Sequence, residues 1–315
     1  MSPPTLFSLP QRSVIEVRGA DRSRWLNGMI SNEISDLQGE KNGCPAVLLS
    51  RQGRVIADLH VLVLPDCIWL ELESDFTELV IKELDRYIIA DRVELQNLAR
   101  RISRYCIEGE EAIELIRRVS KGSISEHRYA GSEVQFEGLT SIVANYELGS
   151  PSGVQIFLPS ENAAEFEELL FSSEKTLVKG TAEAFEGSRV IAGRPRLGAE
   201  LDETVLPDEA NLGDAISTTK GCYIGQEVIA RLRSRGKIKH QLVGLLFDEH
   251  VSSDSSLTSF GKKVGEVTSV VFVEGLGVAG LGFVQVEQSD PGTQLKVGKI
   301  NVKVVSLPMA IEEKS

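Results

Sequence analysis

The strongest constraint on the fold is a change of sequence pattern near residue 240. Before it, alternating apolar segments typical of strands are interleaved with helical patterns. After it only strand patterns remain, separated by turns that contain glycine and by a short serine-rich loop at 251–259. Because no helix is left there to cover a sheet, we expect the last part of the chain to form a small antiparallel barrel or sandwich.

The first hundred residues predict a mixed α+β unit. Two consecutive strands are indicated at 53–64 and 67–73, separated by the turn residues Pro65 and Asp66. Residues 75–89 carry apolar side chains at helical spacing, which predicts an amphipathic helix lying on the sheet. This unit therefore needs helices and strands together to bury its apolar faces.

Between residues 101 and 178 the order of elements changes. A strand, a helix, several strands, an acidic helix and a last short strand follow one another, which is the ferredoxin-like order with room for an extra strand. Residues 181–192 then predict another helix, closed by Gly193 at its carboxyl end. We predict an α+β protein of three units: 1–100 with 179–237, a ferredoxin-like 101–178, and a β-barrel at 238–315.

The formal net charge of −12 argues against nucleic-acid binding by the overall field, so we expect no direct contact with nucleic acid. No apolar run approaches the ~20 residues that cross a bilayer, and the first residues lack a secretory signal, so we expect no membrane association. Four widely spaced cysteines without a CxxC pair predict neither a zinc site nor a disulfide framework. We therefore expect a cytoplasmic protein with reduced thiols and no metal site.

Cys222 stands between a glycine and a tyrosine at the predicted entrance of a helix that ends at Gly236. The partial positive charge of a helix amino terminus, together with nearby Lys220, favours a reactive thiolate. The alternative is that Cys222 packs as a small apolar side chain. Gly221 and Gly225 favour the first reading, because glycine permits a tight bend or close approach.

The segment 220–239 is basic in an acidic protein. Six cations against Glu227 give it a charge of +5 and leave −17 for the remainder of the chain. It predicts either a solvated helix face or a local site for an anionic ligand such as a carboxylate or phosphate. The residue pattern leaves both interpretations open.

The stretch KGCYIGQE (220–227) resembles the signature of the folate-binding YgfZ family, a branch of the superfamily that includes the aminomethyltransferase of the glycine-cleavage system. Other similar stretches support the resemblance almost from end to end: RWLNGMISNEISDL (24–37), SRQGRVIADLHVL (50–62), the residues 188–212 and GEVTSV (265–270). It implies three subdomains in a ring around a channel, one of them ferredoxin-like, followed by the C-terminal antiparallel barrel. It also implies tetrahydrofolate or a one-carbon derivative in that channel.

In that family the role is support of iron–sulfur cluster assembly or repair, serving cluster-dependent enzymes such as those that thiolate tRNA. The resemblance therefore implies folate and iron–sulfur proteins or assembly factors as partners, with Cys222 as the working thiol and Lys220 and Tyr223 beside it. The implied folate-binding residues are Asn32, Arg54, Asp58, Arg189, Arg194, Gly221, Gly225, Gln226 and Glu227. Of these, Arg189 and Arg194 would meet the glutamate carboxylates, while a structural ion pair is the alternative for Arg54 and Asp58.

Two departures separate the chain from the glycine-cleavage branch. Ile191 stands where aminomethyltransferases carry an acidic residue, and no asparagine-rich loop precedes Asp75. We therefore expect an accessory protein in which Cys222 ligates iron, accepts a one-carbon unit or forms a mixed disulfide. A folate-dependent one-carbon transferase, which needs a carboxylate beside the reacting carbon, and a non-catalytic scaffold are the alternatives, so whether the chain is an enzyme stays open.

Overall fold

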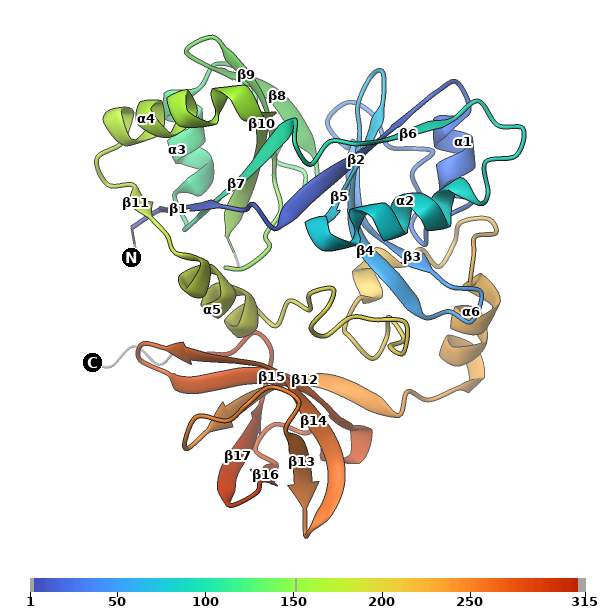
Figure 1. Cartoon of the computed structure of the whole chain (residues 1–315), viewed down its shortest axis with the longest axis vertical. Helices are drawn as coiled ribbons and strands as arrows, with labels where there is room; N and C mark the ends of the chain where they lie inside the picture. The colour runs from blue at the N-terminus through green and yellow to red at the C-terminus, as the bar shows by residue number, and fades with distance from the viewer. Residues whose placement is uncertain (1–2, 151, 311–315) are drawn as a thin grey trace.

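The computed structural model describes residues 3–150 and 152–310 and contains two β-sheets and a closed barrel. These three bodies lie around a central region, with the two sheets side by side and the barrel below them (Figure 1). The ring of subdomains and the C-terminal antiparallel barrel predicted from the sequence are thereby confirmed.

The first sheet has five strands in the order β3-β4-β5-β2-β6. Helix α2 packs on it through Val80 and Leu84, which belong to the same apolar core as strand residues such as Ile15 and Leu70. The helix predicted at 75–89 is confirmed, although it ends at Asp85. The elements are β2 (Arg12–Arg18), α1 (Arg22–Asn27), β3 (Gly43–Leu49), β4 (Val55–Val63), β5 (Ile68–Glu73), η1 (Ser74–Phe76), α2 (Thr77–Asp85) and β6 (Glu94–Asn97).

The second sheet has six strands in the order β11-β1-β7-β10-β9-β8. Helices α3 and α4 cover one of its faces, where Leu115 and Phe166 pack with strand residues such as Ile107 and Ile156. The elements are β1 (Thr5–Ser8), β7 (Ile102–Glu108), α3 (Ala112–Val119), β8 (Gly131–Phe136), β9 (Leu139–Ala144), β10 (Gly153–Pro159), η2 (Ser160–Asn162), α4 (Ala163–Ser173) and β11 (Val178–Lys179).

The amino-terminal strand β1 does not belong to the first sheet. It pairs antiparallel with β7 and parallel with β11, and so lies between these two strands of the ferredoxin-like unit. Strand β2 follows after a short link and lies inside the other sheet (Figure 1). Strand pairing therefore crosses the predicted limit at residue 100, while the division into domains stays a prediction.

The carboxyl-terminal body is a closed barrel of strand order β12-β15-β14-β13-β16-β17. Its interior is filled by apolar side chains such as Leu245, Val267 and Val302. Part of the serine-rich stretch expected to be a loop supplies β13, without which the barrel would be open. The elements are β12 (His240–Phe247), β13 (Ser256–Ser259), β14 (Lys262–Val273), β15 (Gly277–Gln285), η4 (Val286–Gln288), β16 (Gln294–Val297) and β17 (Ile300–Val305).

A central segment joins the three bodies. Helix α5 (Ala182–Ala192) begins at Thr181, whose hydroxyl accepts a hydrogen bond from the Ala184 amide, and ends at Gly193. Gly193 has a φ of 70°, and a Cβ there would lie 2.8 Å from the Leu307 side chain. After an irregular stretch containing η3 (Gly213–Ala215), helix α6 (Gln226–Arg235) leads into the barrel. The predicted ends of both helices are confirmed.

A buried charge cluster joins the two sheets. Arg12 of β2 donates two 2.6 Å hydrogen bonds to the Glu71 carboxylate of β5 and one of 2.9 Å to Glu73. Arg104 of β7, in the other sheet, donates to the same Glu71 at 3.0 Å. Burial alone would raise the pKa of Glu71, but Arg12 and Arg104 lower it to about 2. The carboxylate is therefore charged and shared by both sheets.

No helix within the described ranges, 3–150 and 152–310, is long and apolar enough to span a bilayer.

We predict that Glu71→Gln lowers the free energy of unfolding by about 3–5 kcal/mol, because it leaves the buried Arg12 with Glu73 alone and removes the carboxylate partner of the buried Arg104. Urea denaturation followed by circular dichroism at about pH 7 measures the change. Glu83→Gln is the control, since it breaks a surface pair with Arg86 and should cost less than about 1 kcal/mol. Equal losses in the two variants would show that the cluster does not hold the sheets together.

Candidate ligand-binding site

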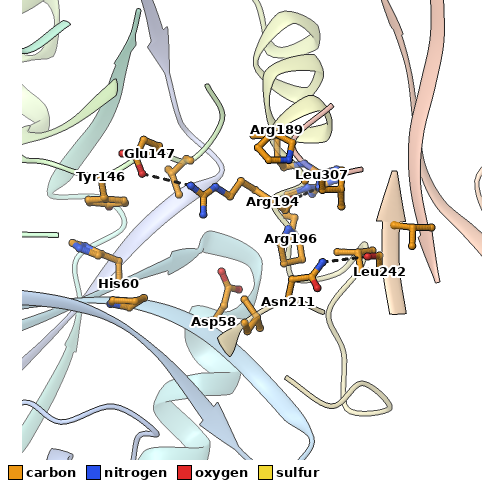
Figure 2. Close-up of a pocket in the computed structure, with 18 of the residues that line it drawn as sticks. Asp58, His60, Tyr146, Glu147, Arg189, Arg194, Arg196, Asn211, Leu242 and Leu307 are labelled. Carbon is orange, nitrogen blue, oxygen red and sulfur yellow. Dashed lines mark hydrogen bonds and ion pairs between the residues drawn. The ribbon is translucent and has the colours of Figure 1, made fainter. Parts of the chain in front are cut away.

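A cavity of about 590 Å³ lies where the three bodies meet. Figure 2 shows side chains converging on it from β4, from the loop after β9, from the end of α5 and from the barrel. Such a volume is ordinary for a small-molecule site. Its polar lining residues are Arg12, Asp58, His60, Glu73, Tyr129, Tyr146, Glu147, Arg189, Arg194, Arg196, Asn211, Gln241, Ser289 and Ser306.

Asp58 supplies a carboxyl group to this cavity. Its position in β4 puts it on the same face of the strand as His60, two residues along. Figure 2 shows the Asp58 side chain directed into the cavity, and its buried Oδ1 has no hydrogen-bond partner among the described residues. Nearby Arg12 is already bound by Glu71 and Glu73. The cavity thus contains a carboxyl group with an unused acceptor.

Burial raises the pKa of Asp58 to about 6, and the charges of Glu73 and Glu71 add to the increase while Arg12 opposes it. The carboxyl group therefore changes its protonation state near pH 6. A carboxyl group with a raised pKa in a cavity can accept hydrogen bonds from a ligand or move a proton to or from it.

Aromatic rings form one wall. The His60 ring stacks on Tyr146 with centroids 3.6 Å apart, and its Nε2 lies 3.1 Å from the carbonyl oxygen of Tyr129. Burial lowers the pKa of His60 to about 3, so the ring is neutral near pH 7. The neutral, flat wall suits a planar ligand ring.

Three arginines of α5 and of the segment that follows it line the cavity, and they differ in how fully their donors are used. All five N–H groups of Arg189 have partners within the chain: Glu186, Glu200, Ser269 and the carbonyl oxygen of Arg194. Arg189 therefore holds α5 to the barrel and has no donor left for a ligand. The expectation that it meets a ligand carboxylate finds no support in this geometry.

Arg194 and Arg196 are less fully used. Arg194 lies 3.5 Å from Glu147 and Arg196 lies 3.8 Å from Glu186, which are long ion-pair distances. The buried Nε atoms of both arginines lack a hydrogen-bond partner within the described part of the chain. These two guanidinium groups, rather than Arg189, have donors free for an anionic group in the cavity.

Asn32 and Arg54, two further predicted binding residues, do not line the cavity. The Asn32 amide donates to the carbonyl oxygens of Pro45 and Asp214, and Arg54 donates to Thr204 and lies 3.7 Å from Glu209. These contacts hold loops of the first body together, which is the structural alternative considered for Arg54.

The signature segment 220–227 also lies outside the cavity lining. The Lys220 ammonium is buried and lies 2.6–3.1 Å from four oxygen acceptors of Asn27, Ile30 and Asn32. Burial lowers its pKa to about 8. Tyr223 is buried, with its ring centroid 5.4 Å from the ammonium. Lys220 thus anchors the segment from inside.

Cys222 is exposed, whereas the other three cysteines are buried. Gly221 beside it has open space around its Cα. Gly225 begins α6 with a φ of 83°, and a Cβ there would lie 2.6 Å from the Ser50 carbonyl oxygen, so only glycine allows this approach to the β3–β4 turn. Gln226 and Glu227 form the first turn of α6. Cys222 therefore faces solvent rather than the cavity, and its role stays a prediction.

Several cavity residues were not foreseen from the sequence, chiefly His60, Tyr146, Glu147 and Arg196. A signal existed for His60, because it is a polar residue two positions from Asp58 in an otherwise apolar strand. Tyr146, Glu147 and Arg196 lie on irregular segments, and only the packing of the three bodies brings them together. Among the residues described, no group of three His, Cys, Asp or Glu side chains is placed to hold a metal ion.

Comparison with known proteins gives a match to the GCVT N-terminal domain over residues 5–220. A chloroplastic protein of Arabidopsis thaliana, provisionally named a transferase, is 29% identical over 93% of this chain and 68% of its own length. An aminomethyltransferase of Caldanaerobacter subterraneus is 25% identical over 93% of the chain and 80% of that protein.

Among solved structures, the glycine cleavage system aminomethyltransferase T of Bartonella henselae superposes with a TM-score of 0.86. The alignment covers 99% of this chain and 88% of that one, at 18% identity. The likeness shows a shared fold across all three bodies.

We predict that Asp58→Asn stabilises the protein at about pH 7 by about 1–3 kcal/mol and has little effect at about pH 4. The native state binds this proton more tightly than the unfolded chain does. Asp58 therefore costs stability as the pH rises from its ordinary value of 3.8 through about 6. Urea denaturation at both pH values tests this, with the exposed Asp66→Asn as control. If Asp58→Asn changed the free energy of unfolding equally at the two pH values, the raised pKa of Asp58 would be contradicted.

Proposed function

This chain belongs to the family of the GCVT N-terminal domain, and from that premise we propose that it binds tetrahydrofolate or a one-carbon derivative in its central cavity. The observation that carries the proposal is the unpaired carboxyl of Asp58 directed into a cavity that also has an aromatic wall and underused arginines. Aminomethyltransferases among its relatives support a folate, because enzymes of that kind use tetrahydrofolate.

The chemistry of the lining fits the parts of a folate. A pterin ring is flat and carries N–H donors, which suits the wall of His60 and Tyr146 and the acceptor of Asp58. The glutamyl end carries carboxylates, which suit Arg194 and Arg196. In this assignment Arg189 positions the segment that carries these two arginines and does not touch the ligand.

We further propose that the chain falls in the YgfZ branch and supports iron–sulfur cluster assembly or repair through Cys222. Support comes from the location of the thiol: it is exposed and outside the cavity lining, so it is presented to a partner protein rather than to the bound folate. Its partners would be iron–sulfur proteins or assembly factors. Cytoplasmic location stays a prediction, since one relative is named as chloroplastic.

A second candidate is a folate-dependent one-carbon transferase. It needs a carboxylate beside the reacting carbon, and Asp58 is placed to serve as one. In that case Asp58 would be the essential group and Cys222 would be dispensable. A scaffold that works through protein contacts alone would need neither side chain.

We predict that tetrahydrofolate binds wild-type protein and Cys222→Ala equally well, because the thiol does not line the cavity. Anaerobic calorimetric titration measures both affinities. Binding that is lost in Cys222→Ala would place the thiol against the ligand, and no binding to either protein would remove the folate assignment.

We also predict that Cys222→Ala abolishes support of a cluster-dependent tRNA-thiolating enzyme, read as tRNA thiolation in cells whose own copy of the gene is deleted. Cys67→Ala is the control, since that cysteine is buried in the turn between β4 and β5. Retained thiolation in Cys222→Ala, together with steady turnover of a methylene donor that is lost in Asp58→Asn, would favour the transferase. Retained thiolation without turnover would favour the scaffold.

A further inference from the structure

We propose that Glu147 is an internal competitor for the ligand carboxylate at Arg194, so that exchange of one carboxylate for the other sets the preference of the cavity for carboxylate-bearing ligands. This inference rests on the folate site proposed above. It assigns to Glu147 a role in specificity, with Arg194 as the group over which the two carboxylates compete.

Arg194 reaches across the cavity toward Glu147 (Figure 2). It comes from the segment that follows α5, whereas Glu147 lies in the loop after β9. The only ion pair of Arg194 in the described part of the chain is this contact, 3.5 Å between Nη2 and Oε2. A paired guanidinium and carboxylate normally approach to about 2.7–2.9 Å with two hydrogen bonds. The contact is therefore loose and one-sided.

Glu147 has a closer partner elsewhere. Arg128 donates to it from Nε at 3.3 Å and from Nη2 at 3.2 Å. Both bonds end on Oε2, the same oxygen that faces Arg194. One carboxylate oxygen is thus shared by two guanidinium groups, so this pair of arginines has room for a second carboxylate.

The arrangement makes exchange possible without leaving a charge alone. If a ligand carboxylate takes Arg194, Glu147 keeps Arg128, and each guanidinium then has its own anion. The half-exposed Arg194 and its buried, unpartnered Nε give the incoming group more donors than Glu147 uses now. Without a ligand, Glu147 keeps Arg194 from remaining an unpaired cation near Tyr129.

The two neighbouring arginines are placed differently. Arg189 has no free donor, as described above. Arg196 faces Glu186 at 3.8 Å, but Glu186 belongs to α5, so this pair joins residues of the same central segment. Arg194 alone among the three shares a carboxylate that is anchored on another body of the protein.

The test compares two ligands that differ only in charge: tetrahydrofolate and its diamide, in which both glutamyl carboxylates are carboxamides. Each is titrated anaerobically into wild type, Glu147→Gln, Arg194→Gln, Arg128→Gln and the double variant Glu147→Gln/Arg194→Gln. Thermal unfolding midpoints establish that each variant is folded. Arg128→Gln is the matched control, because it removes the other partner of Glu147 and leaves the competitor in place.

We expect Glu147→Gln to increase the affinity for tetrahydrofolate about two- to fivefold, which corresponds to the energy of a partly exposed ion pair. The affinity for the diamide should not change. Arg128→Gln should weaken the binding of tetrahydrofolate, because Glu147 then has Arg194 as its remaining partner and competes more strongly for it. In the Arg194→Gln background the effect of Glu147→Gln should vanish.

Equal effects of Glu147→Gln on both ligands, or no effect on tetrahydrofolate, would overturn the competition while leaving the folate site standing. Tighter binding of tetrahydrofolate by Arg128→Gln would overturn the competition as well, even if Glu147→Gln failed to fold. If neither ligand bound the wild type, the proposed function would fail and this inference with it.

Discussion

The Glu71 carboxylate is the contact on which the relative position of the two sheets depends. It accepts from Arg12 of one sheet and from Arg104 of the other, and all three side chains are buried. The guanidinium of Arg12 donates its hydrogen bonds to Glu71 and Glu73, and the Oδ1 of nearby Asp58 is left without a partner in the described part of the chain. The same cluster that joins the sheets therefore leaves the candidate site an unpaired carboxyl oxygen, so stability and ligand chemistry are coupled at these residues.

Local signals in the sequence predicted much of the fold because they depend on neighbouring residues only. Gly193 and Gly236 marked helix ends, and the alternating strands after residue 240 marked the barrel. The placement of β1 in the far sheet could not be read locally, since its partner β7 is distant in sequence. Strand β13 pairs mainly with the adjacent β14, but its residues SLTS contain a single apolar side chain and so gave no strand pattern. Of the predicted site residues, Asp58, Arg189 and Arg194 meet at the cavity, but the saturation of Arg189 follows from tertiary contacts with Glu200 and Ser269.

The central cavity and the segment around Cys222, which the sequence suggested as one site, are spatially distinct. The cavity is built from all three bodies, whereas Cys222 lies on the outside of the first, before α6. Lys220 fixes the signature segment to the first body, because its ammonium donates to carbonyl groups at and just after the end of α1. Such an arrangement lets a ligand occupy the centre while the thiol stays available to a protein outside.

The position of β1 has a consequence for how the chain is made. Its residues are synthesised well before those of its partner β7, which begins at Ile102, and of its other neighbour β11 at Val178. Strand β1 must therefore wait for most of the second body to be synthesised before it finds a place, while β2, a few residues later, pairs with β5 much sooner. The ferredoxin-like unit cannot be completed from its own stretch of chain, and β1, which is made before the other strands of that sheet, is among the last of them to be enclosed.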